Sequence, residues 1–360
     1  MSPSIAYNTT ANSSSSTLLP RHMSNYTERQ FRLVFLWLII AVGLIANSFI
    51  VAVIKIFPSM RTTTNYFLLN VAAADITTLI FTVIHLIIPK MVPFRQGALG
   101  SFLCKFIYTN NITMVTLLVT ALTLTLLAVE RYQAMVKPLI TSRRIDVERV
   151  AYFIIGIWMV SIGITTPLFV SVDYRSKTGC SPGNDLNEMR VYVTCLIITL
   201  TLIPFAGIAF CYSKIISGLY CDKTICSRAH VYTQKDMAEK KRLLVLFVVL
   251  TSVFFVSFVP YGVVFILQFS GKESAAHSQI FARLRMFVQY LILLNCSLNP
   301  FIYAAPSSNY RYCLKYIVKK IFCRDSPEEL YAIELPKRRG FFAWSSATEF
   351  KLGSKSCFEA

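Results

Sequence analysis

The stretch FIYTNNITMVTLLVTALTLTLLAVER, residues 106–131, places 24 uncharged residues directly before an acid–base pair, Glu130 and Arg131. As a helix it is longer than the about 20 apolar residues that cross the ~30 Å hydrocarbon core of a bilayer. Charges at the edge of such a core are costly unless they are paired or carry a function. The stretch therefore predicts a membrane-spanning helix that ends at a functional ion pair.

Six more segments have the same character, and one of them is interrupted only by Asp75 and His85. The whole chain is 55% hydrophobic and only 15% charged, whereas soluble domains carry roughly 25% charged residues. Helices satisfy their own backbone hydrogen bonds in lipid, and these runs are too long for barrel strands. The sequence thus predicts an all-α membrane protein, a seven-transmembrane helix bundle, rather than a soluble enzyme. The helices are expected near residues 31–57, 64–91, 104–135, 148–171, 190–219, 237–269 and 279–304.

Basic residues predict how the bundle is oriented. With the N-terminus outside, 24 of the 36 lysine and arginine residues lie on the cytoplasmic side, in agreement with the positive-inside rule. Three N-glycosylation sequons support this orientation, because such sites are useful only in the lumen. They begin at Asn8, Asn12 and Asn25. We expect a multi-pass protein of the plasma membrane with an extracellular N-terminus.

Four segments organise the chain. Residues 1–30 are predicted to be a flexible, glycosylated extracellular tail, residues 31–305 the seven-helix domain and residues 324–360 a disordered cytoplasmic tail. Residues 306–323 are predicted to form an amphipathic helix, whose apolar side chains recur at helical spacing and suit the membrane surface. Cys323 closes that helix and is a candidate for palmitoylation. The net charge of +18 is attributed to basic residues beside the spans, where they attract anionic lipid headgroups, and not to nucleic-acid binding.

Topology limits the disulfide bonds. Of the ten cysteines, only Cys104 and Cys180 are expected on the extracellular side, where conditions are oxidising. We therefore expect a disulfide between them, which would attach the second outer loop to the top of helix 3. No pair of cysteines has a convincing metal-ligand spacing, so no metal site is predicted.

Polar residues inside the predicted spans mark a second feature. Asp75 is the only acid deep within a span, and a carboxylate there must be paired, hydrated or protonated. One interpretation is a polar knot of hydrogen bonds between helices, formed by Asp75 with Asn47, Asn295 and Asn299. The other is an allosteric site for Na⁺ or a proton near Asp75, whose occupancy changes with conformation. No other cofactor is expected.

Motif residues occur in order along the seven spans. They are Gly43, Asn47, Leu69, Asn70, Ala74, Asp75, Cys104, Glu130, Arg131, Tyr132, Pro138, Leu139, Trp158, Pro204, Tyr212, Phe254–Pro260 and Asn299–Tyr303. With them the chain resembles the rhodopsin-like (class A) G-protein-coupled receptors over about residues 31–323, and most of all the peptide and neuropeptide receptors. The resemblance implies a signalling receptor without enzyme activity. It also implies a heterotrimeric G protein as partner, together with arrestin and receptor kinases.

The resemblance also implies roles for these residues. Glu130 would restrain Arg131 at rest, and activation would free the arginine to meet the G protein and Tyr212. Pro138 and Leu139 would contact the G protein beside the arginine. The full set of expected activation-switch residues is Glu130, Arg131, Tyr132, Tyr212, Phe254, Phe258, Pro260, Asn299, Pro300 and Tyr303.

Three departures from the family pattern change these expectations. Phe258 stands where the family usually has Trp, so the aromatic pivot lacks an indole N–H. The inner end of helix 6 carries the basic run 240–242 in place of an acid, which argues against a second ionic lock on Arg131. Cys104 and Arg131 are 27 residues apart, more than is usual, which predicts a bulge or a shifted top of helix 3.

The ligand is inferred by exclusion. No acid stands at Asn111 or Thr113, where amine receptors bind ammonium, and Leu293 replaces the lysine that binds retinal in opsins. Outside, 12 basic residues face 5 acids, which would steer an acidic or carboxylate-bearing ligand but also suits ordinary surface solubility. A short neuropeptide fits best. Its pocket is predicted to be lined by His85, Thr113, Leu117, Tyr261, Phe265, Gln268, Arg285 and Gln289.

Other functions stay open. The apolar pocket would equally suit a lipid or a small organic acid. A receptor-like membrane protein that does not signal is a further alternative, against which the motifs at Glu130–Tyr132 and Asn299–Tyr303 argue. A membrane enzyme or channel is disfavoured, because the sequence has no metal cluster, nucleophile–base pair or pore-lining polar ring.

Overall fold

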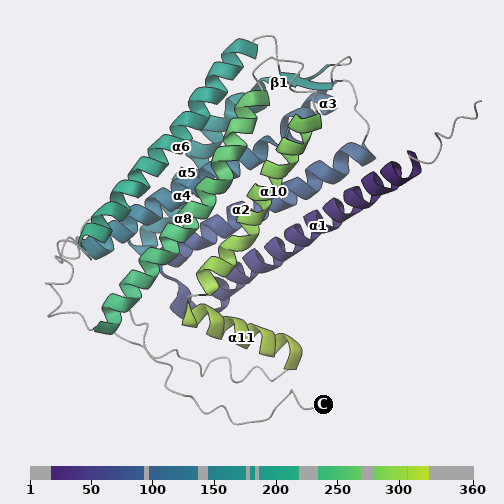
Figure 1. Ribbon diagram of the computed structural model, residues 1–360. Coiled ribbons are helices and arrows are strands. Elements are labelled where there is room, and N and C mark those ends of the chain that lie inside the picture. The colour runs from purple at the N-terminus through teal and green to yellow at the C-terminus, as the bar shows by residue number, and fades with distance from the viewer. Residues whose placement is uncertain are drawn as a thin grey trace, which may run out of the picture.

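Seven long helices lie side by side in one bundle in the computed structural model (Figure 1). Each has a segment long and apolar enough to cross a membrane, so the predicted all-α bundle is confirmed. The structure describes residues 18–92, 97–136, 145–175, 179–182, 186–218, 234–268, 279–305 and 307–323. The long helices are α1 (Leu18–Ile56), α2 (Thr63–Met91), α4 (Asn111–Val136), α5 (Val147–Val170), α6 (Leu186–Ile216), α8 (Gln234–Gln268) and α10 (Gln279–Ala304).

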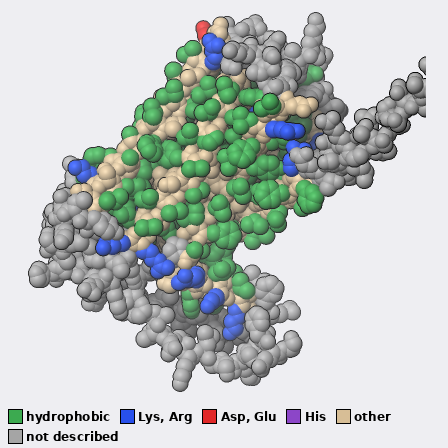
Figure 2. Space-filling view, in the orientation of Figure 1, with side chains coloured by type: hydrophobic (Ala, Val, Ile, Leu, Met, Phe, Trp, Pro, Cys, Tyr) green, Lys and Arg blue, Asp and Glu red, His purple; other side chains and the backbone are tan. Residues whose placement is uncertain are grey.

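Helix α4 is the centre of the bundle. It contacts α2, α5, α6 and α8, and most of its leucine and threonine side chains are buried. The outer helices instead present apolar side chains to their surroundings, among them Ile155 and Met159 of α5 and Ile203 of α6. Figure 2 shows that such side chains form a belt over the visible face, with lysine and arginine at its margins. An exposed apolar surface of this kind fits contact with lipid.

The helix boundaries agree with the expected ones to within a few residues, except at the start of α4, where residues 104–108 form a separate turn, and at α1. This helix begins at Leu18, so residues 18–30 are helical and our expectation that all of residues 1–30 form a flexible tail is corrected. The segment contains no glycine, and its one proline, Pro20, lies in the first turn, where a helix tolerates it. Adding residues to the end of an existing helix also avoids the free-energy cost of nucleating a new one. Asn25 lies in this extension, and Asn8 and Asn12 lie outside the described residues.

The chain before α4 departs from regular α-helix. The short helix α3 (Ala98–Leu103) leads into a π-helical turn, η2 (Cys104–Tyr108), and Asn110 then adopts a positive φ of 53°. A π turn takes up an extra residue, and asparagine is one of the few residues that enters the left-handed region readily. Both features absorb the long spacing from Cys104 to Arg131, so the predicted bulge at the top of helix 3 is confirmed.

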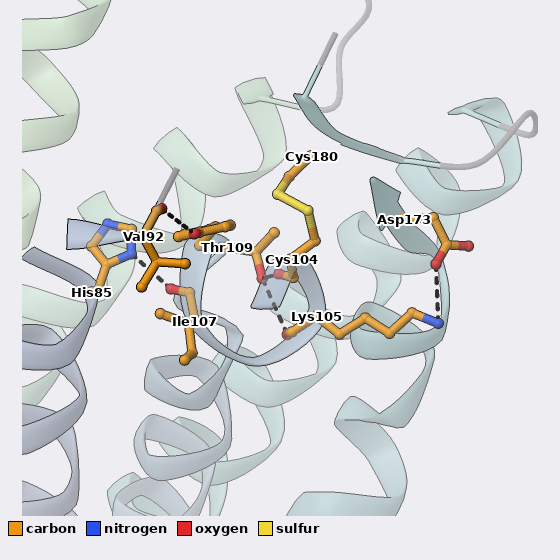
Figure 3. The surroundings of a disulfide bond; sticks show 9 residues. His85, Val92, Cys104, Lys105, Ile107, Thr109, Asp173 and Cys180 are labelled. Atoms are coloured by element: carbon orange, nitrogen blue, oxygen red, sulfur yellow. Dashed lines mark hydrogen bonds and ion pairs between the residues drawn. A yellow bond between two sulfur atoms is a disulfide. The ribbon is translucent and has the colours of Figure 1, made fainter. Parts of the chain in front are cut away.

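A β-hairpin between α5 and α6 was not anticipated from the sequence. Its strands β1 (Val172–Arg175) and β2 (Gly179–Pro182) pair antiparallel. Cys180 of β2 forms the predicted disulfide with Cys104 of η2, and the Cα atoms of the two residues are 5.4 Å apart (Figure 3). Each strand has only four residues, too few for an alternating pattern to stand out.

Further contacts hold the hairpin against the bundle. Lys105 of η2 forms an ion pair with Asp173 of β1, with 3.1 Å between the nitrogen and oxygen atoms (Figure 3). His85 of α2 forms a hydrogen bond of 2.8 Å between its Nδ1 atom and the Ile107 carbonyl of η2. These contacts join α2, η2 and β1 at one end of the bundle, which we call the hairpin end.

The opposite end carries α11 (Ser308–Cys323), the amphipathic helix predicted for residues 306–323. It turns away from the bundle beneath α10 (Figure 1) and contacts both α1 and α10. Tyr310 donates a hydrogen bond to Asn65 of α2, and the Tyr316 ring packs edge-on against Phe57, with 5.5 Å between ring centres. These contacts define the α11 end of the bundle. The side chain of Cys323 lies outside the described residues.

Candidate functional site

The predicted ion pair lies at the α11 end of α4. Arg131 donates to both carboxylate oxygens of Glu130, at 2.6 Å from Nε and 3.0 Å from Nη2. The arginine and glutamate side chains are only 5% and 7% exposed. Two bonds to one carboxylate make the strongest geometry for an arginine–acid pair. The carboxylate therefore neutralises the arginine where little water reaches either group.

Arg131 also contacts two other helices. Its Nη2 donates to the hydroxyl of Thr64, at the start of α2. Its guanidinium carbon lies 5.6 Å from the centre of the Phe247 ring on α8, within the range of a cation–π interaction. Neither partner was predicted, because each is an ordinary residue of its segment and only tertiary packing brings it to the arginine.

The other residues predicted for this end lie at different depths. Tyr212 of α6 is buried. Tyr132 of α4 is half-buried and packs against Phe210 of α6, with 6.2 Å between ring centres. Pro138 and Leu139 lie outside the described residues. The structure thus places α6 aromatic side chains beside α4 at the level of the ion pair.

A cluster of aromatic rings fills the middle of α8. Phe254 and Phe258 are stacked, with ring centres 5.5 Å apart. Phe255 packs edge-on against Phe254 and against Phe205 of α6. Pro260 lies inside α8 just beyond this cluster, where it removes one backbone donor. The predicted aromatic pivot, which is buried, and its half-buried proline therefore lie within two turns of each other on α8.

Asp75 and Asn299 are joined directly, as the polar knot requires. The Asn299 amide donates to the Asp75 carboxylate at 2.8 Å, across α2 and α10. Asn47 instead donates to the backbone carbonyls of Gly43 and Cys296, each at 2.9 Å, and so links α1 to α10. Three helices therefore meet through buried polar groups in the middle of the bundle.

Some polar atoms in this middle region have no hydrogen-bond partner among the described residues, although they are buried. They belong to four side chains. The atoms are the amide oxygens of Asn47, Asn295 and Asn299 and the hydroxyl oxygen of Tyr303. Buried polar groups are normally bonded, so the region has oxygen acceptors to offer. Pro300 lies inside α10 next to Asn299, as predicted.

Threonines on α4 form a hydrogen-bond network that was not predicted from the sequence. Thr116 bonds to Thr78 of α2, with 2.6 Å between hydroxyl oxygens. Thr123 accepts a 2.8 Å bond from Asn70 of α2, whose amide oxygen accepts a 2.9 Å bond from Trp158 of α5. The signal for it was the spacing of the α4 threonines, which puts them on one helical face. They stand at positions 113, 116, 120 and 123.

The residues predicted to line a ligand pocket lie on α2, α4, α8 and α10. Tyr261 and Phe265 of α8 are stacked, with ring centres 6.0 Å apart. The bond of His85 to η2 favours a packing role for that residue. The buried members of the set are Thr113, Leu117, Tyr261 and Phe265, and the exposed or half-buried ones are His85, Gln268, Arg285 and Gln289.

Comparison with known proteins decides the family. The family model described as 7 transmembrane receptor (rhodopsin family) matches residues 46–303, from within α1 to the end of α10. The chain belongs to this receptor family. The match includes the Glu130–Arg131 pair and the Asn299–Tyr303 stretch, so the resemblance drawn from these motifs is confirmed. The receptor is a G-protein-coupled receptor, a signalling protein and not an enzyme.

Curated relatives of the receptor are similar over most of its length. Galanin receptor type 1 of Mus musculus is 32% identical over 314 residues, which cover 83% of this chain and 85% of that protein. The Pyroglutamylated RF-amide peptide receptor of Mus musculus is 26% identical over 293 residues, 76% of this chain and 66% of that protein. The KiSS-1 receptor of Mus musculus is 25% identical over 296 residues, 79% and 72% of the two chains.

Proposed function

We propose that the receptor binds a short extracellular peptide, a neuropeptide, and in response activates a heterotrimeric G protein. The observation that carries the proposal is its similarity, along most of the chain, to receptors for galanin and for a pyroglutamylated RF-amide peptide. The family alone does not select a ligand. The relatives favour a peptide over the lipid or small organic acid that the sequence left open.

The proposed orientation puts the hairpin end outside the cell and the α11 end in the cytoplasm, in the plasma membrane. The distribution of basic residues supports it, since 24 of 36 fall on the α11 side in this orientation. Figure 2 shows a row of lysine and arginine side chains along the margin of the apolar belt that leads to α11. The disulfide between Cys104 and Cys180 supports it too, because the hairpin end would then be the oxidising side.

The peptide would enter at the hairpin end. Described side chains there include the exposed Lys90, Arg190 and Arg285, against the exposed acids Asp173 and Glu188. This excess of basic groups supports a ligand with an acidic side chain or a free carboxylate. The stacked Tyr261 and Phe265 rings, which are buried in the last turns of α8, would provide an apolar lining below this end. A peptide that combines aromatic and acidic groups fits both.

The signal would pass along α8 to Arg131. The aromatic cluster around Phe258 and the interior Pro260 provide a segment that can bend, because the proline leaves one carbonyl of α8 unbonded. Movement of the α8 end next to α4 would then uncover Arg131 for the G protein, with Pro138 and Leu139 beside it. The two states of such a bundle differ by a few kcal/mol, so a ligand need only favour one of them.

A bound Na⁺ ion near Asp75 is proposed for the resting state. The donor set fits a hard cation, which prefers oxygen ligands. The Asp75 carboxylate supplies the negative charge, and the unbonded amide oxygens of Asn47, Asn295 and Asn299 supply neutral donors. When bound, the ion would compensate the buried carboxylate. Among the described residues, no group of His, Cys, Asp and Glu suited to a metal centre occurs.

Helix α11 is proposed to lie on the cytoplasmic membrane surface. Leu314 and Val318 are exposed apolar side chains, next to exposed basic groups such as Arg311 and Lys315. Such a helix binds anionic headgroups. Burial raises the pKa of the Cys313 thiol to about 11, which makes it a poor nucleophile and favours Cys323 for palmitoylation. Arrestin and receptor kinases are proposed as further cytoplasmic partners.

The proposal is tested by G-protein activation in transfected cells. Galanin, a pyroglutamylated RF-amide peptide and a pool of other neuropeptides are applied to cells that display the receptor. The expected result is activation by at least one peptide, and none in cells that display the Arg131→Ala variant at the same surface level. Activation by a lipid or small organic acid, with silence towards all peptides, would replace the peptide with that ligand class.

A further inference from the structure

We propose that Thr64 and Phe247 position the guanidinium of Arg131, and that the Phe247 ring restrains α8 against α4 in the resting receptor. The inference rests on the proposed role of Arg131 in G-protein activation. It starts from a property of the Glu130–Arg131 pair. The two residues are adjacent on α4, so their ion pair moves as a unit with that helix. A bond within one helix cannot hold two helices together.

The contacts of Arg131 that cross between helices include one to α2 and one to α8. Thr64 accepts a hydrogen bond from Nη2 of Arg131, and the Phe247 ring centre lies 5.6 Å from the guanidinium carbon. Phe247 is 1% exposed and Arg131 is almost as buried, so solvent screens the attraction little. If α8 moves away from α4, the ring leaves while the bonds to Thr64 and Glu130 remain. The attraction between Phe247 and Arg131 therefore depends on the distance between α4 and α8.

The composition of α8 explains why an aromatic ring, and not an acidic side chain, contacts Arg131 from this helix. Residues 241–268 contain no acid. The nearest acid before Phe247 is Glu239, eight residues earlier, which is about 12 Å along a helix. An aromatic face attracts a cation through its quadrupole and uses none of the N–H donors of the arginine. Arg131 can therefore keep both hydrogen bonds to Glu130 while its guanidinium contacts Phe247.

Thr64 and Phe247 then have different roles. Thr64 fixes the direction of the guanidinium. It lies on α2, which packs closely against α4, and its hydroxyl bonds to Arg131 near the end of α4. Phe247 adds an attraction that exists only while α8 is close. Without the attraction to the ring, the fraction of ligand-free receptor in which α8 has moved away from α4 should rise by roughly two- to thirtyfold. Loss of the hydroxyl should leave that fraction unchanged.

The test measures the distance between α5 and α8 in ligand-free receptor in lipid nanodiscs, without a G protein. Spin labels are introduced as unnatural amino acids at the exposed Tyr152 of α5 and Arg242 of α8. Position 247 carries phenylalanine, mono- or trifluorinated phenylalanine, or leucine. Fluorine withdraws charge from the ring face at nearly constant shape, and leucine removes the ring. The expected result is a displaced population that rises in steps from phenylalanine to trifluorophenylalanine, with Phe247→Leu highest.

Two outcomes would overturn the role of the ring. One is the same distance distribution in all four proteins. The other is a shift in Phe247→Leu alone, which would assign the effect to packing. The fluorinated series retains the shape of the core, so it reports on the charge of the ring even if Phe247→Leu fails to fold. Failure of the peptide proposal does not affect this result, since neither ligand nor G protein is present.

Thr64 is tested with a conservative pair of variants. Thr64→Val keeps the shape and removes the acceptor, and Thr64→Ser restores it. We expect Thr64→Val to leave the distance distribution unchanged and to alter ligand-free nucleotide exchange on the G protein by roughly two- to tenfold, with Thr64→Ser at the wild-type level. A displaced α8 in Thr64→Val, or equal exchange in all three proteins, would refute the separate positioning role of Thr64.

Discussion

Two buried polar sites in this receptor differ in how completely they are bonded. At the α11 end, Arg131 has a carboxylate, a hydroxyl and an aromatic ring as partners. In the middle of the bundle, Asp75 accepts a bond from Asn299, while several side-chain oxygens nearby have no partner among the described residues. A fully bonded site stabilises the arrangement it has, whereas an incompletely bonded one can gain from an added ligand. The comparison favours a restraining role for the first site and agrees with the proposal that the second binds a cation.

The largest effect is expected where the bonded site is broken. Arg131→Ala should reduce agonist-stimulated G-protein activation to background, because the proposed contact with the G protein is lost. It should also destabilise the receptor by about 3 kcal/mol, because Glu130 is left buried without its partner. Activation is measured per receptor at the cell surface, and stability by thermal unfolding of purified receptor.

A neutral double variant separates the two consequences. Glu130→Gln combined with Arg131→Met leaves no buried charge, so it should recover most of the lost stability while activation stays at background. Recovery of signalling in the double variant would contradict a direct role of the arginine.

A packing change next to the middle site should have the next largest effect. A Cβ atom at Gly43 would lie 2.5 Å from the Ser297 hydroxyl oxygen and 2.8 Å from Leu79 Cδ1. Gly43→Ala should therefore separate α1 from α10 and cost about 1–3 kcal/mol in thermal unfolding. The control is Gly156→Ala on α5, where a Cβ would meet nothing within 4 Å. Equal melting temperatures for the two variants would show that Gly43 is not a close contact.

The open donor set at Asp75 predicts a smaller effect that depends on the ion. If Na⁺ binds the resting receptor, saturating Na⁺ should stabilise it by about 1–2 kcal/mol over the same concentration of a bulky organic cation. Asp75→Asn should abolish this difference, whereas Thr77→Val on the same helix should keep it. A Na⁺ response of the same size in Asp75→Asn would remove the proposed ion site.

The exposed ion pair at the hairpin end should have the smallest effect and sets a reference for the buried pair. The Lys105 and Asp173 side chains are 29% and 54% exposed, so water and salt screen their attraction. Asp173→Asn should change thermal stability by less than about 1 kcal/mol, and the change should vanish in high salt. A larger, salt-independent loss would mean that this pair is as well shielded as Glu130–Arg131.

The sequence predicted those parts of the fold that follow from hydrophobic runs. The seven spans, α11 and the disulfide each depend on length, charge or topology, which one chain reveals directly. The hairpin and the early start of α1 were not predicted. The strands are four residues long, and residues 18–30 are mostly polar, so neither segment gives a strong periodic signal.

The same limit applies to the functional site. Glu130 and Arg131 were recognisable because charges at the end of an apolar helix are unusual. Thr64 and Phe247 were not, because threonine and phenylalanine are common in such segments, and only the packing of α2 and α8 against α4 selects these two. The pairing of Asp75 with Asn299 was predictable, since so few groups in the spans can satisfy a buried carboxylate.

The π turn at η2 has a consequence for how the two ends of the receptor can vary. One inserted residue in a regular helix rotates everything on one side of it by about 100°. Here the turn and Asn110 take up the extra length within a few residues. A change in length before Asn110 therefore need not alter the register of α4 from Asn111 to Arg131. Insertions and deletions on the hairpin side of Asn110 can therefore accumulate without rotating the arginine. The hairpin end can therefore vary in loop length while the arginine keeps its place in the bundle.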